Sequence, residues 1–364
     1  MRETVTYPAL EIDRKKLADN AKVVTDICSV AGINVAGVVK VVSGDPVCAR
    51  IMHENGCEWI ASSRLAQLER LCREHPDIPL LLLRVPMVSE ADRLVRVASM
   101  SLNSDIDVLR AIDVAAGKAG VIHEVILMIE LGDLREGIWM AEEYIAVASE
   151  VEDGLKNLHL AGTGTNLGCY GSILPTKEKM EQLVVATERI ESSIGRRLDI
   201  VSGGGSTSLP LVVRGEMPPR VNHLRIGEGI VVCKDNEDLY GISIDGTHRD
   251  VLTLKAEVIE TRVKPSHPIG EIAYDAFRGR PSYVDRGERK RALLGVGKLD
   301  YCRLDWIVPE MPGIEILGAS SDHTILDIEN ADSDIRVGDL LTFDVLYSAV
   351  AFLSISSDVV KRYI

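Results

Sequence analysis

The sequence has few aromatic residues and no excess of basic ones. Aromatic residues make up 4% of the 364 residues, and 55 acidic residues outnumber 41 basic ones, which gives a formal net charge of −14. An acidic surface is a poor match for nucleic acid or for an anionic membrane. The shortage of aromatic side chains also argues against a surface on which nucleic-acid bases stack. We therefore expect neither nucleic acid nor membrane as a partner.

The cysteines show no sign of a disulfide framework or of a metal site. There are seven of them, they are scattered, and no two form a CxxC motif. An odd number of unpaired thiols is typical of a protein kept in the reducing cytoplasm. Of the histidines near the C-terminus, His248, His267 and His323, only His248 precedes an aspartate by two residues (Asp250), and none begins an HxxxC motif. The sequence thus predicts a cytoplasmic protein with no metal site.

Long hydrophobic runs are also missing. The longest, residues 78–88 (IPLLLLRVPMV), is interrupted by Arg84 and Pro86 and is too short to span a bilayer. The first residues, MRETVTYPALEID, contain no apolar core of the kind found in a secretion signal. Both observations favour a protein without a membrane segment or a signal peptide.

What the sequence does contain is a repeated alternation of apolar strands and amphipathic helices. Eight strand-like runs are separated by helical stretches, at residues 35–40, 59–63, 79–85, 100–104, 124–131, 158–166, 198–206 and 223–230. Apolar strands alternating with helices predict a parallel sheet covered by helices. About eight such units predict a TIM (β/α)8 barrel, an α/β fold. A Rossmann-like sheet is the alternative, but no strand is followed by a GxGxxG motif.

The pattern changes after about residue 245. Residues 250–265 (DVLTLKAEVIETRVKP) alternate apolar and polar side chains, and later runs are short and interrupted by Gly, Asp and Asn. This pattern indicates a mainly antiparallel β domain. We therefore expect residues 1–240 to form the barrel and residues 241–364 to form the β domain.

A single lysine, Lys40, ends the first of the eight strands. In a TIM barrel the carboxyl ends of the strands surround the active site. Partial desolvation disfavours an ammonium ion, so a lysine at this place can be a neutral amine that forms a Schiff base. The alternative is a lysine whose charged end simply reaches solvent.

Other strand ends carry polar groups that extend this pattern. Arg135 follows the fifth strand, Asn166 ends the sixth, and Arg225 lies in the eighth. The seventh ends in residues 202–208 (SGGGSTS), where glycines and hydroxyls can surround a phosphate, although a plain turn is the alternative. Arg225 could instead pair with a protein carboxylate. An amine, two arginines and a phosphate site together match pyridoxal phosphate, a phosphorylated aldehyde.

These motifs resemble those of the fold-type III pyridoxal-phosphate enzymes, the alanine racemase superfamily, and most closely its ornithine racemase branch. Residues 7–22 (YPALEIDRKKLADNAK) are similar to the family's N-terminal segment, whose first strand joins the C-terminal domain. VVKVVSGDP, ELGDLREG, SGGGS and RIGEG resemble the family's cofactor motifs. The resemblance implies that Lys40 binds the cofactor covalently and that Arg135 lies near its phenolate oxygen and the substrate. It implies further cofactor contacts at Asn166, Ser202, Gly204, Ser206, Arg225 and Gly227, with Arg225 facing the pyridine nitrogen.

The resemblance also extends to the predicted β domain. GEIAYDAF is similar to the segment that carries the family's catalytic tyrosine, which implies that Tyr274 is the second catalytic residue beside Lys40. LGASSDH is similar to a segment of the ornithine racemase branch and implies that Ser321, Asp322 and His323 bind substrate. The family forms head-to-tail homodimers, so the resemblance implies the same arrangement here.

Four positions depart from the alanine racemase pattern. Gly44 replaces a tyrosine, Asn166 replaces a histidine, and Lys298 replaces another tyrosine. The last phosphate-binding tyrosine is missing, which leaves Ser357 or a neighbour to serve. These departures make a simple alanine racemase doubtful without affecting the cofactor.

The resemblance implies an isomerase that interconverts the enantiomers of a free amino acid with two bases. The branch suggests a basic substrate such as ornithine or lysine, whose side-chain amine could meet Asp322, Asp300 or Glu130. The alternatives are a broad-specificity alanine or serine racemase, a lyase of the D-threonine aldolase type, and a pyridoxal-phosphate-binding protein without activity.

Overall fold

The computed structural model describes residues 6–364, and the chain divides into two compact units. One unit comprises Lys15–Arg249, and the other combines the residues up to Arg14 with Asp250–Ile364. The first unit continues to Arg249 rather than ending at residue 240. Asn20 explains this difference, because its side chain accepts a hydrogen bond from the backbone N–H of His248 and donates one to the His248 carbonyl.

The first unit is a closed barrel of eight strands, β2 to β9 in chain order. Each strand pairs in parallel with its neighbours, and β2 pairs with β9 to close the ring. The strands are β2 Asn34–Val38, β3 Trp59–Ser62, β4 Leu80–Leu82, β5 Met100–Asn103, β6 His123–Met128, β7 Leu158–Gly164, β8 Ile200–Gly205 and β9 His223–Ile226. Six of them lie within the runs predicted from the sequence, and β2 and β6 each begin one residue earlier, which confirms the TIM barrel.

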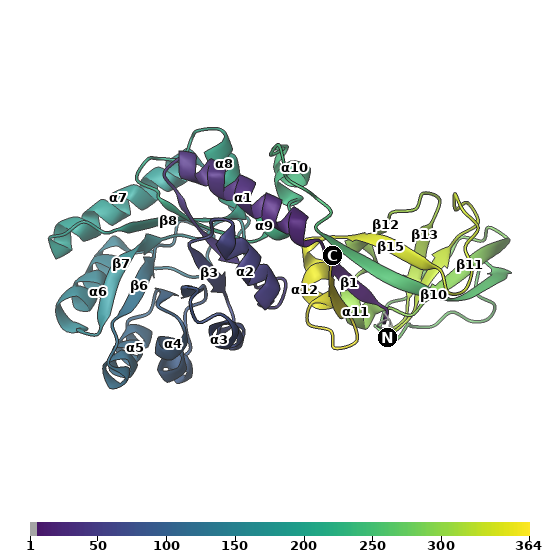
Figure 1. The fold of residues 1–364 in the computed structure, drawn as a ribbon, viewed down its shortest axis with the longest axis horizontal. Helices are drawn as coiled ribbons and strands as arrows, with labels where there is room; N and C mark the ends of the chain where they lie inside the picture. The colour runs from purple at the N-terminus through teal and green to yellow at the C-terminus, as the bar shows by residue number, and fades with distance from the viewer. Residues whose placement is uncertain (1–5) are drawn as a thin grey trace. The chain divides into compact units, whose positions relative to one another are not determined.

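Helices surround these strands (Figure 1). They are α1 Arg14–Val30, α2 Pro46–Glu54, α3 Leu65–Glu74, α4 Ala91–Val97, α5 Ile106–Ala119, α6 Ala141–Gly154, α7 Lys177–Ile194, α8 Leu209–Val213, α9 Glu228–Val231 and α10 Asp235–Tyr240. Local sequence fixes several ends: the side chains of Asp45, Asp105 and Thr176 accept hydrogen bonds from the first turns of α2, α5 and α7. Gly195 ends α7 in the left-handed conformation, which glycine adopts readily.

The barrel interior is apolar between its two ends. Val38, Leu81, Leu102 and Met128 belong to one cluster of buried side chains from β2, β4, β5 and β6. Burial of such side chains stabilises each by about 1.5–3 kcal/mol relative to exposure. The packed interior leaves the loops at the carboxyl ends of the strands as the place for chemistry.

The second unit is a mainly antiparallel β domain, as predicted. Its strands are β1 Ala9–Ile12, β10 Leu252–Pro265, β11 Glu288–Leu294, β12 Ile307–Pro309, β13 Glu315–Ala319, β14 Thr324–Asp327, β15 Leu340–Val345 and β16 Val360–Tyr363, with helices α11 Lys298–Tyr301 and α12 Tyr347–Leu353. The long strand β10 pairs antiparallel with β1, β11 and β15, whereas β1 and β16 pair in parallel. The N-terminal strand thus belongs to this unit, as the resemblance implied.

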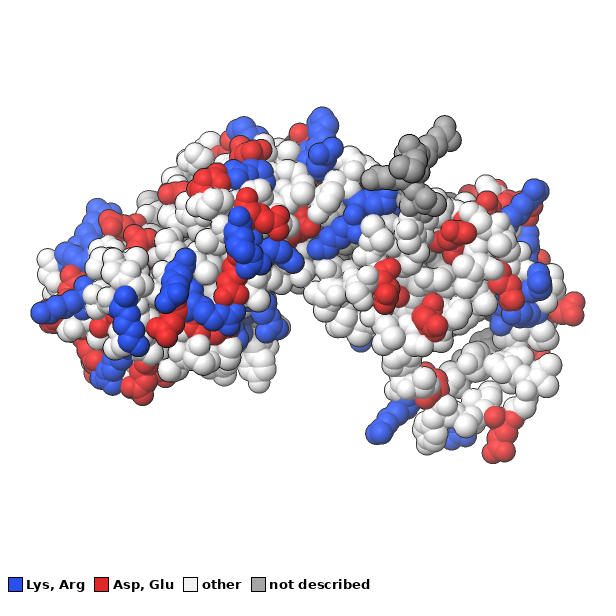
Figure 2. Space-filling model, turned by 60° about the horizontal axis from the view of Figure 1, so that its bottom comes forward, with Lys and Arg blue, Asp and Glu red and all other residues white. Residues whose placement is uncertain are grey.

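The surface and the cysteines agree with the composition. Acidic and basic side chains are interspersed over the face of the barrel seen in Figure 2. Within residues 6–364, no helix has the length and apolar character needed to cross a membrane. All seven cysteines are free thiols.

A buried histidine gives the barrel a testable dependence on pH. His123 is almost fully buried, its Nε2 lies 2.8 Å from the Ser101 hydroxyl, and burial lowers its pKa to about 4. Between pH 6.5 and 4 the unfolded chain takes up a proton there and the folded chain does not. The free energy of unfolding should therefore fall by about 1.4 kcal/mol per pH unit in this window on account of His123.

The prediction is checked by urea unfolding of the wild type and of His123→Gln at several pH values from 7 to 4. Glutamine can keep a hydrogen bond to Ser101 but does not titrate. The free energy of unfolding should fall more steeply with decreasing pH in the wild type than in the variant. Equal slopes would mean that the His123 pKa is the same in the folded and the unfolded chain.

Candidate active site

Lys40 lies at the carboxyl end of the barrel, in the turn that follows β2. The strand itself ends at Val38. The lysine is accessible to solvent, yet enough protein surrounds its amine to desolvate it. Desolvation and the charges of Arg135 and Arg225 lower the pKa of Lys40, while Cys169 and Glu136 act in the opposite direction. The lowered pKa favours the neutral amine, the form needed for Schiff-base chemistry.

Arg225 is buried in β9 and held by neighbouring strands. Its Nη2 donates to the Thr165 carbonyl at 2.8 Å, and its Nη1 donates to the Ser202 hydroxyl. Burial lowers the pKa of Arg225 to about 10 despite the opposing influence of Glu136, so the guanidinium stays charged at neutral pH. The Arg225 guanidinium therefore supplies a fixed positive charge to the site.

Ser202 links Arg225 to a histidine that the sequence analysis overlooked. The Ser202 hydroxyl lies 2.7 Å from Nδ1 of His223. Because this hydroxyl accepts from Arg225, its own proton is directed to Nδ1, which places the imidazole proton on Nε2. Burial and Arg225 lower the pKa of His223 to about 3, so the ring is neutral. His223 precedes Arg225 by two strand positions and shares its face, a signal that the sequence did offer.

The ends of β8 and β9 form the expected site for a phosphate. Backbone N–H groups of Gly227 and Gly229 donate to the Ser206 hydroxyl at 3.2 and 3.1 Å. A Cβ atom at Gly227 would lie 3.0 Å from the Val38 carbonyl oxygen, so the close approach of the two segments requires glycine. Gly204 has φ = +106°, a conformation that also favours glycine. Backbone donors and a hydroxyl thus converge beside the end of β2, the strand that precedes Lys40.

The loop after β7 adds unpaired polar groups to the same end of the barrel. Within the described chain, the buried Oγ1 of Thr165 and the buried Nδ2 of Asn166 have no hydrogen-bond partner. Buried polar atoms without partners are rare in folded proteins, and they mark places where a ligand can bind. Asn166 is therefore suited to donate a hydrogen bond to a bound molecule.

The loop after β6 holds Arg135 beside two residues that the sequence analysis did not select. Nε and Nη2 of Arg135 both donate to the Glu136 carboxylate, and Nη1 lies 2.8 Å from the Cys169 thiol. Glu136 raises the pKa of Arg135. Arg135 is thus near Lys40, but in this arrangement its anionic partner is Glu136.

Asp133 connects the loop after β6 to the loop after β7 through hydrogen bonds. Its buried carboxylate accepts backbone N–H bonds from Cys169 and Tyr170 at 3.2 and 3.0 Å, and a third from Ile173. No short motif reveals such a contact, because its partners lie far away in the sequence. The two loops therefore form one connected rim.

The remaining predicted residues lie in the β domain. Tyr274 is 74% exposed and lies in the loop between β10 and β11. Lys298 is close to this loop, with its Nζ 4.5 Å from the centre of the Phe277 ring and 3.9 Å from Asp275. The roles of Tyr274 and Lys298 in the site stay predictions.

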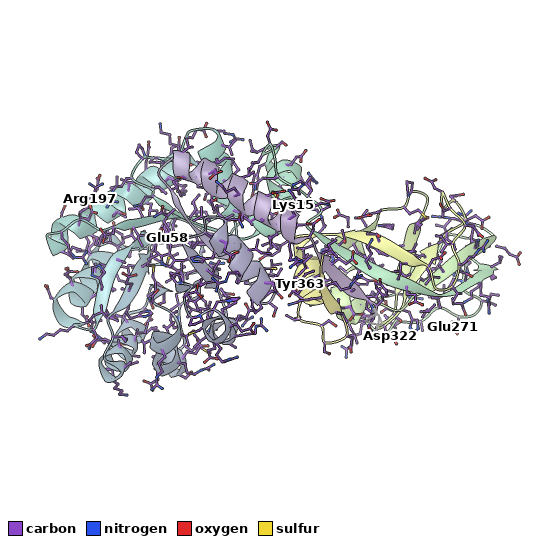
Figure 3. All side chains as sticks on the ribbon, viewed as in Figure 1. Lys15, Glu58, Arg197, Glu271, Asp322 and Tyr363 are labelled. Atoms are coloured by element: carbon purple, nitrogen blue, oxygen red, sulfur yellow. The ribbon has the colours of Figure 1, made fainter. Side chains whose placement is uncertain are left out.

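Ser321, Asp322 and His323 form the turn between β13 and β14 of the same domain. Asp322 is labelled in Figure 3. Asp322 accepts from the Ser321 hydroxyl at 3.0 Å and lies 3.2 Å from Nδ1 of His323. Ser321 and His323 lower the pKa of Asp322, which keeps its carboxylate charged. The three residues are adjacent and polar, and their binding of substrate stays a prediction.

The barrel residues fit pyridoxal phosphate. Lys40 supplies an amine with a lowered pKa for the aldehyde, and the Ser206 hydroxyl, which accepts from the Gly227 N–H, can donate its own proton to the phosphate. The unpartnered amide of Asn166 and the buried cation of Arg225 can meet the ring and its substituents. Among residues 6–364 there is no group of three or more His, Cys, Asp or Glu side chains that could hold a metal ion.

Comparisons with known proteins show the family of this chain. Residues 12–235 match the model of the alanine racemase N-terminal domain. An ornithine racemase from Acetoanaerobium sticklandii is 37% identical over 94% of this chain and 96% of its own length. A lysine racemase from Thermotoga maritima is 36% identical over 99% of both chains.

Solved structures share the fold at low sequence identity. An alanine racemase from D-cycloserine-producing Streptomyces lavendulae has a TM-score of 0.78 at 15% identity, covering 100% of this chain and 98% of that one. A D-threonine aldolase from Filomicrobium marinum has a TM-score of 0.71 at 16% identity, covering 95% of this chain and 89% of that one. The match to the N-terminal-domain model and the two relatives above 30% identity show that the chain belongs to the alanine racemase family.

Proposed function

We propose that the protein is a pyridoxal-phosphate-dependent racemase of a basic amino acid, ornithine or lysine. The observation that carries the proposal is Lys40, an amine of lowered pKa at the barrel end, beside a buried arginine and a phosphate-type site. The substrate class is supported by the relatives named as ornithine and lysine racemases, which match this chain over nearly its full length.

Lys40 has two tasks in this proposal. Its amine holds the cofactor and, once the substrate has replaced it there, moves a proton at one face of the substrate α-carbon. When bound, the cofactor draws electron density from the α-carbon and makes its proton acidic. The lowered pKa of Lys40 brings the amine closer to the range in which a general base works at neutral pH.

Arg225 and its neighbours orient the cofactor ring. Arg225 would hold the cofactor at its pyridine nitrogen, and arginine is too weak an acid to protonate that nitrogen. Ser202 and the Thr165 carbonyl hold the guanidinium in place. The phosphate is bound by Ser206 and by backbone near Gly227 and Gly204.

Tyr274 moves the proton on the opposite face, and it acts from a second copy of the chain. Its loop between β10 and β11 exposes five large apolar side chains, Ile269, Tyr274, Phe277, Tyr283 and Val284. Exposed apolar groups clustered in one loop are typical of a protein interface. The protein is thus a homodimer in which the partner's loop completes each site.

The cytoplasm is the compartment that suits this protein. Four of its seven free cysteines (Cys28, Cys48, Cys57 and Cys233) are buried, and none of the seven is paired. Free thiols persist in reducing surroundings.

The function is tested by incubating the cofactor-loaded protein with each proteinogenic amino acid and ornithine and following both enantiomers by chiral chromatography. Racemisation of ornithine or lysine at the highest kcat/KM supports the proposal. A preference for alanine or serine would identify a broad-specificity racemase. Cofactor absorbance without any turnover would identify a binding protein.

Independence from metal ions is a separate prediction. Two proton-transfer side chains suffice for racemisation, so excess EDTA should leave the rate unchanged, and D-threonine should yield no glycine. The measurement is the rate before and after chelation and after addition of Mn²⁺ or Zn²⁺. Glycine release that depends on added metal would instead identify an aldolase-type lyase.

A further inference from the structure

The charges at the barrel end pose a problem for a basic substrate. Arg135 and Arg225 place two positive charges near the Lys40 amine, and the side-chain ammonium of ornithine or lysine adds a third. Glu136 is the carboxylate that acts on all three of these protein side chains: it opposes the lowering of the pKa of Lys40 and of Arg225, and it raises the pKa of Arg135. Its position is therefore central to this cluster of basic groups.

Other acidic residues already have hydrogen-bond partners. Glu130 accepts from the backbone N–H groups of Gly132 and Arg135, and Asp133 accepts from three N–H groups of the neighbouring loop. Asp300, in the β domain, is similarly occupied by the backbone N–H of Gly297 and the Ser356 hydroxyl. Glu130 and Asp300 thus have structural tasks, although the sequence marked both as candidates for the substrate amine.

Glu136 differs because its partner is itself a group that a substrate can use. The carboxylate occupies Nε and Nη2 of Arg135, the edge through which arginine binds a carboxylate in two-point fashion. A substrate carboxylate that takes this edge displaces Glu136. The Glu136 side chain is only 17% exposed, so a displaced carboxylate loses its cation in surroundings where charge is poorly solvated.

We propose that Glu136 is the binding site for the side-chain ammonium of the substrate, reached by an exchange of partners with Arg135. A diamino acid carries both charges needed for the exchange: its α-carboxylate pairs with Arg135 and its distal ammonium pairs with Glu136. Alanine or serine pairs with Arg135 alone and leaves Glu136 without a cation. The inference rests on the proposed function and explains how the site selects basic amino acids.

The test uses pairs of substrates that differ only in the distal ammonium: ornithine against norvaline, and lysine against norleucine. In the wild type, kcat/KM should be far higher for the diamino acid of each pair. In Glu136→Gln, kcat/KM for the diamino acid should fall by about 30-fold or more, the usual loss when one partner of an enclosed charge pair is removed. The value for norvaline should stay the same or rise, so the ratio should approach one.

Two further variants make the test specific. Glu136→Asp keeps the charge and should retain part of the preference. Glu142→Gln removes an exposed carboxylate in the first turn of α6 and should leave the ratio unchanged. Calorimetric titration with ornithine and norvaline gives a second readout, since affinity for ornithine alone should weaken in Glu136→Gln.

The outcomes separate this inference from the proposed function. The ratio of kcat/KM for ornithine to kcat/KM for norvaline could stay unchanged in Glu136→Gln, either because both values are kept or because both fall equally. That result would mean that Glu136 only holds Arg135 in place, and it would overturn the inference. If the wild type racemises neither ornithine nor lysine, the proposed function itself fails, and the inference fails with it. The visible absorbance of the cofactor and the thermal unfolding midpoint establish that each variant is folded and loaded.

Discussion

Replacing Lys40 with alanine is expected to abolish racemisation and the visible absorbance of the covalently bound cofactor. In the proposed mechanism the variant loses both the amine that holds the cofactor and the base on one face of the α-carbon. Removal of a general base alone slows a reaction by about 10²–10⁴-fold, and loss of covalent attachment adds to this. The measurements are the absorbance spectrum of the purified protein and the rate of enantiomer exchange.

Lys177 offers a matched control for Lys40. It lies at the start of α7, its side chain is more than half exposed, and its Nζ is 3.9 Å from Glu181. Lys177→Ala should keep both spectrum and activity. Treating the wild type with borohydride should fix the cofactor on Lys40, as seen by peptide mapping, and a label on another lysine would contradict the assignment.

The architecture could be predicted because its signals are local. Each barrel strand is a short apolar run bounded by turns, and β10 follows from the alternation in residues 252–265. The position of Lys40 followed from the same pattern with an error of two residues, since β2 ends at Val38. The glycine-rich segment at the end of β8, residues 202–208, could be predicted for the same reason, because its signal lies in consecutive residues.

The residues missed at the site act through partners that are distant in sequence. Asp133 reaches Cys169 and Tyr170 across two loops, and His223 reaches Arg225 through Ser202 of another strand. A charged residue in a polar loop looks the same in the sequence whether it is solvated or paired, so Glu136 could not be distinguished from Glu142. Its importance depends on which cations surround it in three dimensions.

Replacing Tyr274 with phenylalanine should block proton transfer on one face and spare the other. The hydroxyl is the only group lost, so the cofactor spectrum should stay that of the wild type. Solvent deuterium should still exchange into the enantiomer whose α-proton Lys40 removes, while exchange into the other enantiomer should fall by about 10²-fold or more. Mass spectrometry of each enantiomer in D₂O measures this asymmetry. Equal loss for both enantiomers would exclude Tyr274 as the base of one face.

The proposed dimer makes a further result expected, because in it the two proposed catalytic residues of each site come from different chains. Lys40→Ala and Tyr274→Phe homodimers should both fail to racemise the substrate, since every site would lack one base. In a hybrid dimer, one site combines the intact Lys40 of one chain with the intact Tyr274 of the other. Random mixing makes about half of the dimers hybrid, so about a quarter of wild-type activity should return. Native mass spectrometry of chains with different tags establishes that exchange has occurred. Hybrids that form without restoring activity would show that Tyr274 serves the barrel of its own chain or is not a base at all.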